Sequence, residues 1–76
     1  MKIQILGTGC PKCKKLEDNV RAAVHELGLE VEVEKVTAIN DIIGFGVMVT
    51  PGLAIDGDVK SSGKLLSVDE IKGLLK

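Results

Sequence analysis

The stretch that decides the fold is IQILGTGCPKCKKLEDNVRAAVHELG, residues 3–28. It opens with a short apolar, β-branched run bounded by glycines, which predicts a buried strand over residues 2–6. Beyond Pro11 the apolar residues recur at helical spacing, Pro11 suits the first helical position, and Gly28 supplies a stop. We therefore predict a helix over residues 11–27, whose apolar stripe consists of Cys13, Leu16, Val20, Ala23, Val24 and Leu27.

Two cysteines separated by two residues, Cys10 and Cys13, stand where this strand meets the helix. Free backbone N–H groups and the helix dipole stabilise a thiolate at such a junction. Cys10 occupies the N-cap position, so we expect it to be the more readily ionised thiol and the nucleophile. Cys13 lies on the apolar stripe and is expected to be the shielded, resolving thiol. The alternative, two reduced thiols packed as small hydrophobes, is less favoured because Cys10 lies off the stripe in a glycine-flanked turn.

The residues between the cysteines are candidates for tuning the site. The Lys12 ammonium could stabilise the thiolate further, although an ordinary solvated lysine explains the residue equally well. Pro11 suits the start of a helix and also removes one N–H donor from the site.

The remaining chain predicts further short elements. Apolar and acidic residues alternate over Leu29–Val36, which indicates a strand with one wet face. Thr37 is a candidate cap for a short helix that Gly46 ends.

A hairpin and a last helix follow. Residues 53–55 lead into Asp56-Gly57, a pair that favours tight hairpin turns, and a second strand follows. Ser67 and Glu70 form a capping-box pattern at the start of the last helix. The predicted order is β-α-β-α-β-β-α, an α/β fold whose mixed four-stranded sheet is flanked by helices, in a single domain over residues 1–76. The first two strands should be parallel and the hairpin antiparallel, which leaves the cysteines at the carboxyl end of the first strand.

Composition excludes several classes of protein. The chain has 76 residues, 45% hydrophobic content, 1% aromatic content and a net charge of −1, which fits a globular aliphatic core and argues against disorder. Scattered basic residues and the lack of an aromatic platform argue against nucleic-acid binding. No secretory signal or bilayer-length apolar run is found, so we expect a soluble cytoplasmic protein with no membrane partner. Two close cysteines cannot staple distant segments, which favours a catalytic or metal-binding pair.

Together these motifs resemble the thioredoxin/glutaredoxin superfamily, and within it the small thioredoxin-like redox-active disulfide proteins of archaea and bacteria. The resemblance covers essentially the whole chain, and the segments that carry it are Ile3–Leu6 with Cys10–Cys13, Gly46-Val47 with Thr50-Pro51, and Leu53–Ile55 with Asp56-Gly57. It implies a minimal thioredoxin-like fold with a cis Pro51 beside the cysteines. The backbone of Thr50 would then face the dithiol and bind an extended substrate segment. The chain has no tryptophan before its CxxC motif, unlike thioredoxins.

The function that we expect is thiol–disulfide oxidoreduction by Cys10 and Cys13, acting on a disulfide-containing protein substrate. An external reductant, either a reductase or a low-molecular-weight thiol, would regenerate the dithiol, and no cofactor or metal is required. We expect a monomer. The main alternative is a metal-binding module resembling copper chaperones, since two thiolates suit Cu(I), although those proteins have the order β-α-β-β-α-β. A non-catalytic thioredoxin-like interaction domain is a further alternative.

Overall fold

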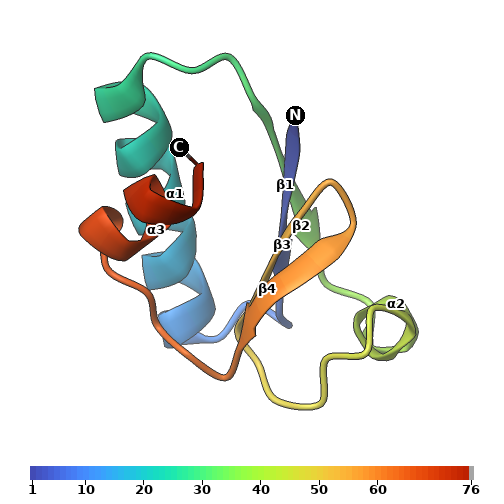
Figure 1. The fold of residues 1–76 in the computed structure, drawn as a ribbon. Helices are drawn as coiled ribbons and strands as arrows, with labels where there is room; N and C mark the ends of the chain where they lie inside the picture. The colour runs from blue at the N-terminus through green and yellow to red at the C-terminus, as the bar shows by residue number, and fades with distance from the viewer. Residues whose placement is uncertain (76) are drawn as a thin grey trace.

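A computed structural model describes residues 1–75 and has the predicted order of elements (Figure 1). No helix within these residues is both long enough and apolar enough to cross a membrane. The elements are β1 (Lys2–Leu6), α1 (Pro11–Leu27), β2 (Glu32–Val36), α2 (Ile39–Gly44), β3 (Gly52–Ile55), β4 (Asp58–Ser62) and α3 (Val68–Leu75).

The strands form one mixed four-stranded sheet in the order β2-β1-β3-β4. β1 runs parallel to β2 and antiparallel to β3, and β3 pairs antiparallel with β4. This confirms the predicted parallel crossover and antiparallel hairpin. The order of elements differs from the β-α-β-β-α-β order of the copper-chaperone alternative, and it leaves the end of β1 and the start of α1 at one edge of the sheet.

Helices cover the two faces of the sheet unequally. α1 and α3 lie together on one face, whereas the short α2 lies on the other (Figure 1). Alternation along β1 sends Ile3 and Ile5 into the larger core cluster under α1 and α3, and Leu6 into the smaller cluster under α2. The larger cluster therefore holds α1 on the sheet through Leu16 and Val20, which are fully buried.

The end of α1 explains why β2 is shorter than predicted. Gly28 adopts a left-handed conformation with φ of 65° and donates its N–H to His25, and the N–H of Leu29 bonds to the carbonyl of Val24. Leu29 is thus engaged in the helix cap and cannot join the sheet. Pairing with β1 begins where Lys2 lies opposite Glu32 and the N–H of Glu32 bonds to the carbonyl of Met1. The prediction of a strand from Leu29 was therefore wrong by three residues, and β2 begins at Glu32.

The start of α2 also differs from its prediction. Ala38, and not Thr37, is the N-cap, and no side chain caps the helix. The helix has only 6 residues and is held by burial of Ile42 in the smaller core cluster. Its end is close to the predicted one, because Gly46 has φ of 87° and donates its N–H to Ile43.

The hairpin and the last helix follow their local sequence signals. Asp56 and Gly57 have φ of 52° and 84°, as a tight hairpin turn requires. The buried side chain of Gln4 accepts a hydrogen bond from the N–H of Gly57 at 3.1 Å and so ties the turn to β1. Ser67 and Glu70 exchange side-chain-to-backbone hydrogen bonds of 3.2 Å each, which confirms the capping box of α3.

Truncating a side chain in the larger core cluster should loosen α1 from the sheet. We expect Leu16→Ala to lower the free energy of unfolding by about 2–5 kcal/mol, because a fully buried leucine leaves a cavity. The matched control is Leu65→Ala, whose side chain is 43% exposed and should cost about 0.5 kcal/mol or less. Urea denaturation followed by circular dichroism measures both. Equal losses in the two variants would contradict this account of the core.

Candidate active site

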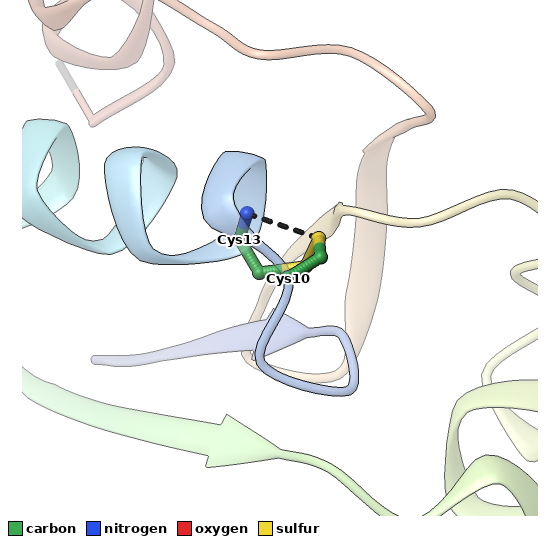
Figure 2. The surroundings of a disulfide bond; sticks show 2 residues. All are labelled: Cys10 and Cys13. Carbon is green, nitrogen blue, oxygen red and sulfur yellow. Dashed lines mark hydrogen bonds between the residues drawn. A yellow bond between two sulfur atoms is a disulfide. The ribbon is translucent and has the colours of Figure 1, made fainter.

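A disulfide between Cys10 and Cys13 lies at the junction of β1 and α1 (Figure 2). The Cα atoms of the two cysteines are 5.1 Å apart, within the usual range for a disulfide. Cys10 is the N-cap of α1, and its Sγ accepts a hydrogen bond from the backbone N–H of Cys13 at 3.3 Å. The same sulfur therefore belongs to the disulfide and caps the helix, as the sequence predicts for its position.

The two cysteines differ in exposure. Cys10 is half-buried, whereas Cys13 is only 5% exposed and lies on the helix face that buries Leu16 and Val20. A molecule in solution can therefore reach the sulfur of Cys10 more readily than that of Cys13.

Gly7 is a site residue that the sequence analysis treated only as part of a turn. It is buried at the end of β1, and a Cβ added there would overlap the Sγ of Cys13 and lie 3.1 Å from its Cβ. The lack of a side chain at Gly7 thus allows α1 to bring Cys13 against the end of the strand. A glycine directly after the first strand was the only sequence signal, and it does not reveal this contact.

Thr50 and Pro51 lie beside the disulfide. Their peptide bond is cis, as the resemblance implied. A Cβ on Gly7 would contact both the Cβ of Thr50, at 4.0 Å, and the side chain of Cys13, so these residues meet at the end of β1. Pro51 is fully buried, and Thr50 is exposed. Within residues 1–75 the backbone N–H and carbonyl of Thr50 make no hydrogen bond, which leaves both groups open to an added segment.

A small pocket of about 80 Å³ borders Cys13, and three charged residues contribute to its mainly apolar lining. Glu17, one helical turn after Cys13, lines this pocket together with Lys35 of β2. Arg21 donates two hydrogen bonds to Glu17, of 2.8 and 3.0 Å, and Lys35 lies 3.5 Å from it. The hydrogen bonds from Arg21, with a smaller contribution from the charge of Lys35, lower the pKa of the Glu17 carboxyl. The sequence analysis missed Glu17, although its spacing of four from Cys13 indicates the same helix face.

An apolar pocket of about 280 Å³ lies on the other side, toward α2. Met48 is 84% exposed and Ile39 and Ile43 are more than half exposed, which is unusual for side chains of this size. Two of its lining residues are polar, namely Thr8, which follows β1, and Thr50, which precedes Pro51. Its lining residues are Thr8, Ile39, Ile42, Ile43, Val47, Met48 and Thr50.

The residues between the cysteines are both exposed. Pro11 begins α1, as predicted, and the side chain of Lys12 forms no ion pair with the described part of the chain. Their effect on the site stays a prediction. Across residues 1–75, no three His, Cys, Asp or Glu side chains are grouped so that they could hold a metal ion.

The chain is similar over its whole length to known proteins. The thioredoxin domain family model matches residues 1–76. A thioredoxin of Methanothermobacter thermautotrophicus is 49% identical over 75 residues, which cover 99% of this chain and 97% of that protein. A thioredoxin of Methanocaldococcus jannaschii is 51% identical over 74 residues, which cover 97% of this chain and 85% of the relative. With a CxxC disulfide at the start of α1 and a cis-proline beside it, the chain belongs to the thioredoxin domain family of thiol–disulfide oxidoreductases.

Proposed function

We propose that this thioredoxin-family protein reduces or exchanges disulfides of other proteins, with Cys10 as the attacking thiol and Cys13 as the resolving thiol. The observation that carries these roles is the unequal exposure of the pair. Cys10 is accessible at the N-cap of α1, and Cys13 is buried behind it. Only the accessible sulfur can meet a disulfide on another protein, and only its bonded neighbour is placed to displace the product.

The reaction proceeds in two exchange steps. The Cys10 thiolate attacks one sulfur of the substrate disulfide, which forms a mixed disulfide and releases the first substrate thiolate. The Cys13 thiolate then attacks the Sγ of Cys10, which closes the disulfide seen in the structure and releases the second substrate thiolate. The substrate gains the two electrons that the dithiol loses, and the released thiolates take up protons from water. No cofactor takes part.

The N-terminus of α1 favours the first step. The backbone N–H of Cys13 already points to the Sγ of Cys10, so the same bond is available to a thiolate. Lys12 adds positive charge in the first helical turn and Pro11 fixes the start of the helix, so both tune the thiol without taking part in exchange.

Substrate binding requires an extended segment beside the disulfide. The unpaired backbone groups of Thr50 can bond to such a segment as an added strand would, and buried Pro51 holds Thr50 in place. The apolar pocket next to Thr50 would then receive a substrate side chain close to the attacked cysteine.

An external reductant must reopen the Cys10–Cys13 disulfide after each turnover. A reductase or a low-molecular-weight thiol fills this role. We also propose that the protein works in the cytoplasm, because a dithiol that donates electrons depends on a compartment that keeps thiols reduced.

Replacing each cysteine separately should distinguish the attack on the substrate disulfide from the resolution of the mixed disulfide. We expect Cys10→Ser to abolish reduction of insulin disulfides, because the buried Cys13 cannot attack in its place. Cys13→Ser should form a mixed disulfide with substrate that persists, because the resolving thiol is missing. Non-reducing gel electrophoresis and mass spectrometry detect the adduct. If both variants kept the wild-type rate, the proposed function would be wrong.

A methyl group at position 7 should slow the attack of Cys13 on the mixed disulfide more than the attack of Cys10 on the substrate. In Gly7→Ala the new Cβ overlaps the Sγ of Cys13, so this sulfur has to move away from its place behind Cys10. We expect kcat/KM for insulin reduction to fall by about 10-fold or more, with accumulation of mixed disulfide. The control is Gly73→Ala in α3, where an added Cβ meets no atom within 4 Å. Wild-type turnover in Gly7→Ala, with no adduct, would contradict the role of this close approach.

A further inference from the structure

The basic side chains of residues 1–75 fall into two groups. Five of them form ion pairs, namely Lys2–Glu34, Arg21–Glu17, Lys35–Glu17, Lys60–Asp58 and Lys72–Glu26, and the pair of Lys35 with Glu17 lies at the small pocket next to Cys13. Within residues 1–75, the lysines that form no ion pair are Lys12, Lys14, Lys15 and Lys64, which we call the unpaired lysines. They are not distributed at random.

Three of the unpaired lysines border the active site, whereas Lys64 lines a separate pocket with Glu70. Lys12, Lys14 and Lys15 are exposed on the first turns of α1, and Lys14 lines the small pocket next to Cys13. Lys64 follows Gly63, whose N–H bonds to the carbonyl of Pro51 at 2.8 Å. Three segments contain no Asp or Glu. They are residues 7–16, which carry the disulfide, residues 42–55, which carry Pro51, and residues 59–68, which carry Lys64. These segments carry only basic charges although the net charge of the chain is −1, and the carboxylate at the pocket next to Cys13, Glu17, is paired with Arg21 and Lys35.

Helix stability does not account for this arrangement. The first turn of a helix favours acidic side chains, and α3 follows this rule with Asp69 and Glu70. α1 has no acidic residue in its first turn, and lysines stand there instead. Positive charges repel the positive end of the helix dipole, so they weaken α1 slightly. Local rules of this kind are usually broken where a surface serves a function.

We propose that the unpaired lysines are a docking surface for a redox-partner protein whose disulfide is bordered by carboxylates. The inference rests on the proposed function, because the partner must exchange thiols with Cys10. The lysines flank the disulfide on the side of α1, and the apolar pocket with Met48 and Ile43 lies toward α2. An apolar contact next to unpaired cations is typical of a protein interface in which charge steers the approach.

The test compares two synthetic peptide disulfides that differ only in the residues next to each cysteine, glutamate in one and glutamine in the other. Second-order rate constants are measured for oxidation of the reduced full-length protein by each peptide. The same two peptides are also reduced with dithiothreitol, whose attacking thiolate carries one negative charge as the Cys10 thiolate does, and the protein's glutamate-to-glutamine rate ratio is divided by the dithiothreitol ratio. This normalised ratio removes the intrinsic difference between the peptides.

We expect a normalised ratio of about 10 at low ionic strength, because complementary charge raises the rate of encounter. The ratio should fall toward 1 at about 1 M NaCl, where the Debye length is only about 3 Å. In the double variant Lys14→Gln, Lys15→Gln most of the preference should disappear at low salt. The matched control, Lys2→Gln, Lys72→Gln, removes the same charge from cations that lie near the far ends of β1 and α1, and it should keep the preference.

Several results would overturn the proposal. A normalised ratio near 1 in the wild-type protein, or an equal loss of preference in both double variants, would show that the unpaired lysines do not select acidic partners while leaving the proposed function intact. If the Lys14→Gln, Lys15→Gln variant reacted more slowly than the wild-type protein with both peptides but kept the same normalised ratio, the lysines would act on the Cys10 thiolate and not on docking. Failure to reduce either peptide would remove the proposed function, and the docking surface with it.

Discussion

The active site depends on how closely the first turn of α1 approaches the end of β1. Cys13 is buried against Gly7, and the core beneath α1 keeps the helix in that position through Leu16 and Val20. If this approach were looser, Cys13 would become accessible, and the unequal exposure of the two sulfurs would be lost. The hydrophobic core thus maintains the difference in exposure on which the proposed roles of the two cysteines rest.

The sequence predicts best those elements whose cause is local. β1, α1, the Asp56-Gly57 turn and the Ser67 capping box each depend on residues close together in the chain, and each was found where expected. The start of β2 could not be predicted in this way. It depends on the N–H of Leu29, which bonds within the cap of α1, and on the register with β1, in which Lys2 lies opposite Glu32. The prediction that Thr37 caps α2 failed for a similar reason, because burial of Ile42 holds that helix without a side-chain cap.

In the candidate site, too, the sequence predicts features with a local cause and misses those that depend on contacts between distant elements. The motif identifies Cys10 and Cys13, and resemblance to the family points to Thr50 and Pro51. The contact of Gly7 with Cys13 depends on two elements meeting in space, so no spacing along the chain reveals it. The cationic border of the site is another such case. Each unpaired lysine looks like an ordinary solvated residue in the sequence, and only the ion pairs elsewhere on the surface make these lysines distinctive.

The burial of Cys13 also determines how this protein meets oxidants. Peroxide oxidises accessible thiolates, so we expect the sulfur first converted to a sulfenic acid to be that of Cys10. Cys13 lies within bonding distance and condenses with this species, expelling water and forming the disulfide that the structure contains. Sulfinic and sulfonic acids, which arise when a sulfenic acid meets more peroxide before it meets a thiol, are thereby avoided. The burial of Cys13 that the proposed exchange steps rely on is therefore also expected to keep oxidation of the cysteines at its reversible stage.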